Sequence, residues 1–546
     1  MEKKAKKAKK LRIVLAQLNL LVGDIQGNLD KLIGAAKSAR DLLKADVIVF
    51  PELSITSYPP EDLLFRKSFI DASTDALYEF KEQVRDIYCV VGHPHSTSQG
   101  LFNSCSLIYN GTILGRYAKQ HLPNYGVFDE ARYFTPGNSA CVIPINGIPV
   151  GITICEDLWH PAPIQQAATQ GARIILSPNA SPFEVHKHDE RYETFSKRAK
   201  NARLPIVYVN HVGGQDELVF DGGSMVMNQD GTICQHAGFF NETLFPVDIE
   251  ISSTETTIES KKFSLPNEEE RIYQALVLGV RDYVQKNRFP GALVGVSGGI
   301  DSALTLAIAV DALGKDRVKA VIMPSRYTSS ASMEDAIALI KNLDVEDQTV
   351  SIEPAFTSLT ESLAPHFIGK KSDITEENIQ SRCRGVIIMA FSNKSGYIVL
   401  TTGNRSEMAV GYATLYGDMA GGLAVLKDIP KTLVYRLANY RNKIKFVIPQ
   451  HTIDRAPTAE LAADQKDEDT LPPYSILDKI IERYVDEEQS IDDIVKEGFE
   501  REVVTTIVHL INKSEYKRRQ APIGIRIDHK AFGRDRRYPI TSGFDK

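Results

Sequence analysis

Segment 291–309, GALVGVSGGIDSALTLAIA, has the pattern of a strand, a glycine-rich turn and a helix. Backbone N–H groups in such a turn bind phosphate, and the usual nucleotide-hydrolase loop adds a lysine in the form G-x-x-x-x-G-K-[ST]. Here Asp301 stands near the place of that lysine. Because an aspartate repels phosphate unless a cation lies between them, the loop predicts a Mg²⁺ ion that bridges carboxylate and phosphate.

A second carboxylate for this ion is expected at the end of a later strand. The predicted strand 397–402 leads into TTGNRSE, which supplies Glu407. The pair GG alone would be better explained by a tight strand–helix turn with an acid at the helix start. The full S-G-G-x-D-S after a V-G-V strand is far more specific, so we predict that Asp301 and Glu407 hold Mg²⁺.

Three further residues, Glu52, Lys119 and Cys155, follow predicted strands in the N-terminal half. A cysteine at such a position is a nucleophile if a nearby cation favours its thiolate and a carboxylate handles protons. Each residue alone has an ordinary explanation, as a core cysteine, a surface lysine and a turn-capping glutamate. The three residue types by themselves are therefore weak support for a catalytic site.

The stretches around these residues are more specific. FPELSITSYPPEDL, YAKQHLPNYGVFDEARYFTPG and GITICEDLWHP resemble, in the expected order, the three signature blocks of the nitrilase (carbon–nitrogen hydrolase) superfamily, glutaminase branch. The resemblance covers residues 11–250 and implies an α-β-β-α sandwich that hydrolyses glutamine to glutamate and ammonia.

This resemblance also implies roles for single residues. Cys155 attacks the side-chain amide, Glu52 is the general base, and Lys119 stabilises the oxyanion. Glu130 matches a second, positioning glutamate of the family. Three residues match positions that hold the glutamine substrate, with exposed loop positions as the alternative: Tyr125, Ser181 and Lys187.

The hexapeptide SGGIDS resembles the loop of enzymes that cleave ATP to AMP and pyrophosphate. Together with GYATLYGDMAGGLAVLKDIPKT, RAPTAEL and EYKRRQAP it resembles the NAD synthetase family. The residues that match the ATP site are Gly295, Val296, Ser297, Gly298, Gly299, Ile300, Asp301, Ser302 and Thr402, with Lys431 and Thr458 as further members. Those that match contacts to deamido-NAD⁺ are Asn378, Glu407 and Lys517. Leu415 departs from shorter, ammonia-only relatives that carry a lysine, so contacts to the nicotinate end stay unassigned.

Two kinds of domain are expected to carry these residues. Residues 11–250 contain short β-branched runs, with helical stretches or hairpin turns such as Asn110-Gly111 between them. Residues 251–268 are polar and are predicted to be a linker. In 269–546, strands and helices alternate, which predicts a doubly wound parallel sheet with ligands at the carboxyl ends of its strands. The fold class is therefore α/β in both parts.

Composition narrows the function classes further. The chain has 546 residues, a net charge of −6 and six cysteines, none of them in a C-x-x-C pair. These features give no footprint for nucleic acid and no sign of a zinc site or disulfide framework. No stretch approaches the roughly 18 apolar residues of a membrane helix. We expect a cytoplasmic protein, with the lysine-rich first ten residues as a solvated tail.

The combined prediction is an amide-forming ligase. Deamido-NAD⁺, ATP, L-glutamine and water would give NAD⁺, AMP, diphosphate and L-glutamate, with Mg²⁺ as cofactor and no tightly bound prosthetic group. The resemblance further implies a homo-oligomer. Two alternatives stay open: another glutamine-dependent adenylating amidotransferase, and a nitrilase-like scaffold that binds partners without catalysis.

Overall fold

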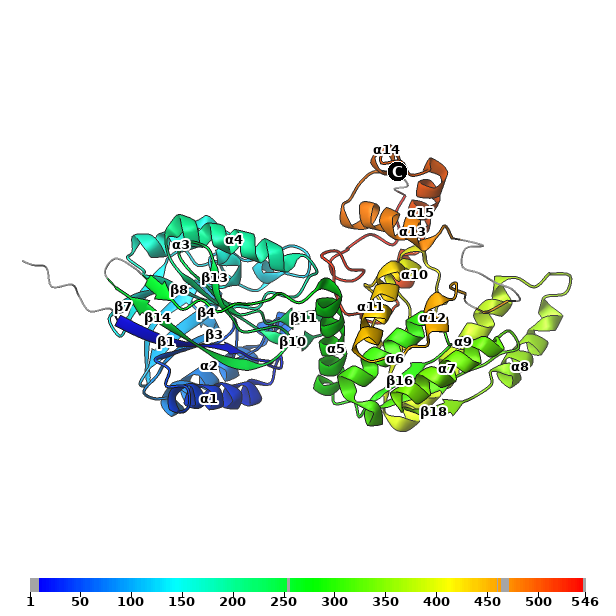
Figure 1. Ribbon diagram of the computed structural model, residues 1–546, viewed down its shortest axis with the longest axis horizontal. Coiled ribbons are helices and arrows are strands. Elements are labelled where there is room, and N and C mark those ends of the chain that lie inside the picture. The colour runs from blue at the N-terminus through cyan, green and yellow to red at the C-terminus, as the bar shows by residue number, and fades with distance from the viewer. Residues whose placement is uncertain (1–8, 253–255, 459, 463–470, 544–546) are drawn as a thin grey trace, which may run out of the picture. The chain divides into compact units, whose positions relative to one another are not determined.

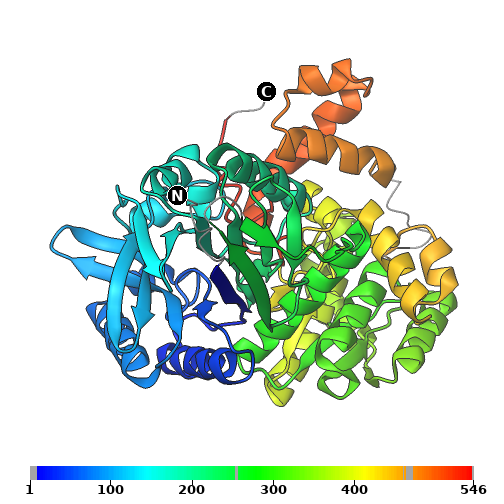
Figure 2. The same cartoon turned by 60° about the vertical axis from the view of Figure 1, so that its left-hand side comes forward.

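A computed structural model describes residues 9–252, 256–458, 460–462 and 471–543 of the chain. The chain divides into two compact units, Met1–Pro266 and Asn267–Lys546 (Figures 1 and 2). The lysine-rich residues 1–8, expected to be a solvated tail, lie outside the described residues. So does the acidic stretch within 463–470.

The first unit contains two main sheets. The seven-stranded sheet has the order β15-β14-β1-β2-β3-β4-β5, and the six-stranded sheet has the order β13-β12-β9-β8-β7-β6. The strands of the first are β1 (Lys9–Gln17), β2 (Val47–Val49), β3 (Tyr88–Thr97), β4 (Gly100–Tyr109), β5 (Thr112–Ala118), β14 (Thr243–Ile251) and β15 (Thr256–Ile258). Those of the second are β6 (Cys141–Ile145), β7 (Ile148–Ile152), β8 (Ile174–Asn179), β9 (Ile206–Asn210), β12 (Met225–Met227) and β13 (Ile233–His236). A separate hairpin pairs β10 (Val212–Gln215) with β11 (Leu218–Asp221).

Helices cover the outer faces of these sheets. Figure 1 shows α1 (Ile25–Asp41) and α2 (Lys67–Gln83) on one side of the strands, and α3 (Pro161–Thr169) and α4 (Lys187–Ala202) on the other. Buried apolar side chains fill the space between the two sheets, and separate clusters lie under each helix pair. This is the predicted α-β-β-α sandwich, and the antiparallel pairs expected from the hairpin turns are present, as between β4 and β5.

The end of the first unit differs from the expected featureless linker. Thr256 and Ile258 of β15 are buried while Thr257 is exposed, the period-two pattern of a strand, and β15 pairs with β14. The backbone N–H of Lys261 then donates to the Cys234 carbonyl on β13 at 2.8 Å. The range 251–268 therefore contains a short edge strand whose threonines give it a polar composition.

The second unit is built on a parallel five-stranded sheet of order β18-β17-β16-β19-β20. Its strands are β16 (Ala292–Gly295), β17 (Val318–Ile322), β18 (Glu346–Thr349), β19 (Ile398–Thr401) and β20 (Leu423–Ala424). The helices that alternate with them are α5 (Glu268–Lys286), α6 (Ile300–Leu313), α7 (Ser330–Leu343), α8 (Glu353–Leu363), α9 (Ile374–Ser395), α10 (Arg405–Val410) and α11 (Lys431–Ile444). The predicted doubly wound sheet is confirmed.

The order of the strands explains where the site of this unit forms. The chain leaves β16 toward β17 on one side and returns to β19 on the other, so the direction of winding changes between β16 and β19. Ligands of doubly wound sheets bind at such a point, beyond the carboxyl ends of the strands. The loop 296–302 and the turn 402–407 follow these two strands and meet there.

Further helices follow α11 in the second unit. These helices are α12 (Gln450–Asp454), α13 (Tyr474–Ile481), α14 (Ile491–Lys496), α15 (Arg501–Lys513) and α16 (Glu515–Arg518). A cluster of buried apolar residues joins α13, α14 and α15 to α10. Within the described part of the chain, no helix combines the length and the apolar composition of a membrane span.

Candidate active sites

The turn after β7 presents Cys155. This residue begins a 3₁₀ turn, Cys155–Leu158, and has a φ of +44°, a backbone conformation that is uncommon for a residue with a side chain. Cys155 is only 7% exposed and belongs to the core between the two sheets. The turn therefore holds Cys155 in a buried position with a strained backbone.

Lys119, at the end of β5, bridges two carboxylates beside it. Its Nζ lies 2.7 Å from Oε1 of Glu52 and 2.7 Å from Oε1 of Glu130. Burial by itself lowers the pKa of Lys119, but the two carboxylates outweigh burial and hold the pKa well above its usual value. The lysine is therefore a permanent, fixed positive charge.

The two carboxylate oxygens of Glu52 differ in their hydrogen bonds. Its Oε1 accepts from Lys119 and from Nδ2 of Asn103 at 2.7 Å, whereas its buried Oε2 has no hydrogen-bond partner among the described residues. Burial, and then the charge of Glu52, raise the pKa of the Cys155 thiol well above its usual value. The resting thiol is thus protonated, and Glu52 offers an acceptor for that proton.

Glu130 is held by a further hydrogen bond besides its contact with Lys119. Its Oε1 also accepts from the Tyr58 hydroxyl at 2.8 Å, and burial raises the pKa of its carboxyl group. The structure therefore brings together Glu52, Lys119 and Glu130, as the sequence predicted for a reactive group with a second glutamate. Cys155 is buried like Glu52 and Lys119, and of these two the carboxylate raises and the ammonium group lowers the pKa of its thiol.

Asp157 was missed in the sequence, and it ties the two reactive loops together. Its Oδ1 accepts from the backbone N–H groups of Gln120 at 3.1 Å and His121 at 2.9 Å. Its Oδ2 accepts from the N–H of Ile154 at 3.0 Å and the hydroxyl of Tyr117 at 2.8 Å. One buried carboxylate thus joins the loop that carries Lys119 to the turn that carries Cys155.

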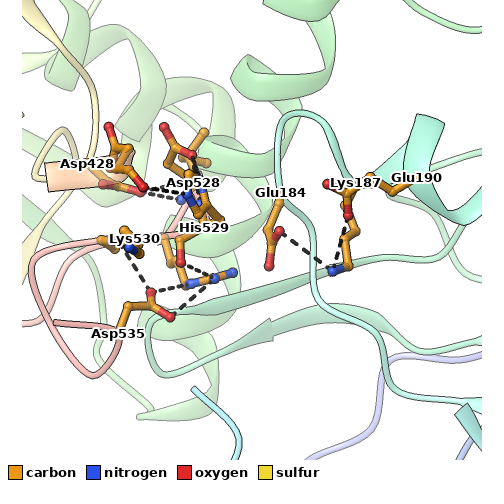
Figure 3. A network of polar contacts seen from close by, with 12 residues as sticks. Glu184, Lys187, Glu190, Asp428, Asp528, His529, Lys530 and Asp535 are labelled. Atoms are coloured by element: carbon orange, nitrogen blue, oxygen red, sulfur yellow. Dashed lines mark hydrogen bonds and ion pairs between the residues drawn. The ribbon is translucent and has the colours of Figure 1, made fainter. Parts of the chain in front are cut away.

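The three predicted glutamine contacts have different surroundings. Tyr125 is 53% exposed, and its hydroxyl donates to Oε2 of Glu156, the residue after the cysteine, at 3.1 Å. Ser181 is buried, and its Oγ accepts from Nε of Arg191 at 3.2 Å. Lys187 lies between two carboxylates, Glu184 at 3.9 Å and Glu190 at 3.6 Å (Figure 3). The structure leaves the role of each as a prediction.

The second unit contains a cavity of about 400 Å³ at the switch point of its sheet. Of the residues predicted to bind ATP, only Gly298 does not line it. Gly298 has a φ of +83°, and a Cβ there would lie 2.2 Å from the Ser332 carbonyl oxygen. Its part is therefore to allow the turn against α7, a position that only glycine can occupy.

Asp301 and Glu407 converge on one cation, which is the ammonium group of Lys431. The Nζ of Lys431 lies 2.5 Å from Oδ2 of Asp301 and 3.3 Å from Oε1 of Glu407. Burial alone lowers the pKa of Lys431, but these carboxylates raise it above its usual value. Asn404 completes the arrangement by donating to Oδ1 of Asp301 at 3.0 Å and accepting from the N–H of Glu407.

The residues predicted to contact deamido-NAD⁺ also line this cavity. Oδ1 of Asn378 accepts from the Thr414 hydroxyl at 2.8 Å, and Nζ of Lys517 donates to the carbonyls of Gly411 and Ala413 at 2.8 Å each. Asn378 and Lys517 therefore engage the same short loop, 411–414, from α9 and α16.

The cavity has further charged residues that the sequence analysis did not single out. Arg384 and Asp418 line it, and burial raises the pKa of Asp418 to about 6. Arg455 donates to the Gly298 carbonyl at 2.9 Å and to the Ser332 hydroxyl at 2.7 Å, so it supports the phosphate-type loop. RAPTAEL, which contains Arg455, was recognised only as a family block.

Comparisons with known proteins agree with this division. Residues 12–259 match the carbon-nitrogen hydrolase family and residues 272–521 match the NAD synthase family. The protein is thus a carbon–nitrogen hydrolase unit joined to an NAD synthase unit. The chain is 46% identical over 539 residues to the glutamine-dependent NAD(+) synthetase of Acinetobacter baylyi, covering 98% of this chain and 99% of that protein. It belongs to the glutamine-dependent NAD(+) synthetase family.

Solved structures support the same conclusion. The glutamine-dependent NAD+ synthetase of Acinetobacter baumannii, in complex with adenosine diphosphate, has a TM-score of 0.80 and 43% identity, covering 97% of this chain and 98% of that one. A glutamine-dependent NAD(+) synthetase from Cytophaga hutchinsonii has a TM-score of 0.83 at 22% identity, with 98% of each chain covered, which shows the shared fold.

Proposed function

We propose that this chain makes NAD⁺ from deamido-NAD⁺, ATP, L-glutamine and water, with AMP, diphosphate and L-glutamate as the other products. Its family gives it glutamine-dependent NAD⁺ synthesis and the class of an ATP-dependent ligase. The observation that supports the full reaction most strongly is the presence of two charged sites in one chain. One surrounds a buried cysteine, and the other lines a cavity behind a phosphate-type loop.

The proposed glutaminase step uses Cys155, Glu52 and Lys119. The thiol proton of Cys155 passes to Oε2 of Glu52 while Sγ bonds to the side-chain amide carbon of glutamine. Lys119 stabilises the oxyanion, and ammonia leaves with the proton from Glu52. Water activated by Glu52 then cleaves the thioester, which releases glutamate and restores the thiol. A protonated resting thiol makes the base necessary, and this agrees with the raised pKa of Cys155.

In the proposed synthetase step, the nicotinate carboxylate of deamido-NAD⁺ attacks the α-phosphorus of ATP, and diphosphate leaves. Ammonia then attacks the resulting acyl-adenylate and displaces AMP. The N–H groups of the loop 297–302 and of the first turn of α6 would hold the departing diphosphate, because a helix N-terminus attracts anions. We assign the ATP and deamido-NAD⁺ contacts to the residues predicted above.

The residues around Asp301 fit a magnesium ion. Asp301 and Glu407 already converge on one cation, and their side chains are 17% and 18% exposed toward the cavity. Mg²⁺ is commonly bound by one or two carboxylates together with substrate phosphates and water. The described residues contain no group of three or more His, Cys, Asp or Glu side chains that could hold a metal ion. The ligands besides Asp301 and Glu407 would therefore be phosphate oxygens and water. When bound, Mg²⁺ would offset the charge that develops on the phosphates.

Several features of the whole protein belong to the same proposal. We assign the glutaminase to residues 11–250 and the synthetase to 269–546, and we propose a cytoplasmic homo-oligomer. The six cysteines are all free thiols, which fits a reducing compartment. Direct transfer of ammonia between the sites would protect it from protonation.

Cys155→Ala in the full chain tests the division of labour. Synthesis with glutamine should be lost, while synthesis with ammonium chloride should be retained at wild-type rate, both followed as NAD⁺ formed. Equal loss of both would contradict the assignment. Omission of deamido-NAD⁺ should abolish pyrophosphate release, whereas an amidotransferase for another carboxylate would continue to release it with its own substrate.

A further inference from the structure

Arg405 is among the largest fully buried side chains in the chain, and it lies two residues before Glu407. Its guanidinium group faces three carboxylates. Nη1 lies 3.2 Å from Asp428 and 3.2 Å from Asp528, and Nη2 donates to Asp486. One short helix, α10, is therefore anchored at its first residue by an ion cluster drawn from three separate parts of the chain.

The C-terminal segment 524–535 supplies much of this cluster. The N–H groups of Ile527 and Asp528 donate to Oδ2 of Asp428 at 2.7 and 2.8 Å, and Arg405 donates to the Lys530 carbonyl at 3.2 Å. His529 bonds Oδ1 of Asp528 at 2.9 Å (Figure 3). This segment lies beyond residues 272–521, where the chain matches the NAD synthase family.

The cluster is costly to bury. Three carboxylates surround one guanidinium, and burial raises the pKa of Asp486 to about 7. A buried ion cluster contributes little net stability, because the loss of hydration offsets the attraction between the charges. Its main effect is to fix geometry, since each partner must stay in place to keep the others paired.

The residues that follow Arg405 show which geometry is fixed. The Ser406 hydroxyl accepts from the N–H of Lys431 at 2.8 Å, and Glu407 pairs with the Nζ of the same lysine. On the other side, Asn404 bonds Asp301. Since α10 has only six residues, it cannot hold this arrangement through its own hydrogen bonds.

We propose that Arg405 is a positioning residue for Glu407, and that the C-terminal segment 524–535 is part of the frame of the synthetase site through Asp528. The proposal rests on the proposed role of Glu407 in holding Mg²⁺. It does not involve contact of Arg405 with substrate or metal.

Asp528→Asn in the full chain tests the proposal without removing the buried cation. Two readouts are followed. The N–H groups of Met408 and Tyr412 donate to the carbonyls of Asn404 and Glu407, at the two ends of α10, and their hydrogen exchange should become about tenfold faster in the absence of ligand. The Mg²⁺ concentration for half-maximal synthesis from ammonia should rise about tenfold, while glutamine hydrolysis at Cys155 stays unchanged.

Arg405→Lys should have the same effects to a greater extent, because a compact ammonium group does not reproduce the planar guanidinium that reaches the carboxylates through two separate nitrogens. Asp492→Asn is the matched control. It loses an exposed ion pair with Arg501 at 2.7 Å that includes no residue of α10 or of the Arg405 cluster, and it should match wild type in both readouts. If Arg405→Lys does not fold, the proposal is tested with Asp528→Asn and His529→Gln. The side chain of His529 is half exposed.

Wild-type exchange and wild-type Mg²⁺ dependence in the folded Asp528→Asn variant would overturn the proposal. Glu407→Gln separates this failure from failure of the proposed function. Full synthesis by Glu407→Gln would show that the role assigned to Glu407 is wrong. Loss of synthesis by Glu407→Gln, combined with unaffected Asp528→Asn and His529→Gln variants, would reject only the positioning role of Arg405 and the segment.

Discussion

Each unit of this protein contains a buried lysine that bridges two carboxylates, and the two bridges differ in how they are enclosed. Lys119 and Glu52 are fully buried, and Glu130 is 5% exposed. Lys431 is 3% exposed, but its partners Asp301 and Glu407 are 17% and 18% exposed and line a cavity of about 400 Å³. The lysines are similar in chemistry, while the access to their partners is not.

Because of this difference, the charge of Lys119 is fixed in place, whereas the charge of Lys431 can be joined or replaced by another cation. In the first unit the lysine has no room to leave its carboxylates, so it can stabilise an oxyanion without rearrangement. In the second unit the carboxylates face open space, so another cation can join or displace the ammonium group between them. The predictions below test this contrast.

The largest effect is expected from Lys119→Met. Synthesis with glutamine should fall about 1,000-fold, because the oxyanion loses its charged partner. The free energy of unfolding should also fall by about 3–5 kcal/mol, because two buried carboxylates remain without a cation. Glutamine-supported synthesis and urea unfolding measure these two effects, and ammonia-supported synthesis, which should be retained, is the control. If ammonia-supported synthesis fell equally, Lys119 would affect both units, and the proposed contrast between the two lysines would be wrong.

Lys431→Met should have a smaller effect on glutamine-supported synthesis, but this effect should extend to ammonia-supported synthesis. Synthesis should fall about 100-fold with either nitrogen source, because the phosphates lose a neighbouring cation. Glutamate release at Cys155 should be unchanged. The effect should be partly recovered at high Mg²⁺, since the carboxylates face the cavity. A loss that Mg²⁺ cannot reduce would show that the second bridge is as closed as the first.

Asp157→Asn tests how the loop that carries Lys119 and the turn that carries Cys155 are held together. Glutamine hydrolysis should fall about 30-fold, because an amide cannot accept from four donors. Burial raises the pKa of Asp157 to about 6. A raised pKa means that the carboxyl group takes up a proton at a higher pH than an exposed aspartate, so the clamp weakens as the pH falls through about 6.

Glutamate release by wild type and Asp157→Asn, followed from about pH 5 to about pH 8, measures this step. The wild-type rate should decrease as the pH falls below about 6, and the ratio of the wild-type rate to the variant rate should decrease over the same range. A ratio that stays constant across the range would mean that the acid limb belongs to another group.

The smallest effect is expected from Tyr125→Phe. The hydroxyl of this exposed side chain bonds Glu156 beside Cys155. Its removal should raise KM for glutamine about fivefold with little change in kcat, because one hydrogen bond near the bound substrate is lost. The kinetics of ammonia-supported synthesis are the control. A change in kcat alone would place Tyr125 in the reaction step instead of in substrate binding.

Much of both sites could be predicted from short stretches of sequence. Asp301 was recognised because an acid in a glycine-rich phosphate loop demands a cation, and Glu52, Lys119 and Cys155 because each follows a strand within a specific block. Asp157 and Arg405 were missed, although they lie within two residues of recognised positions. Their partners are backbone groups of another loop or aspartates far along the chain, and no local pattern encodes such contacts.

The amino-acid sequence alone determined the α/β class and the two kinds of unit, and it predicted the residues of both sites, because periodicity and local motifs depend on neighbouring residues. The tertiary structure decided which of these residues share a charge and which face a cavity. Lys431 illustrates this, since nothing near it in the chain indicates that it lies between Asp301 and Glu407. Burial and the convergence of distant strands set the strength of each charge, and these are properties of the folded chain only.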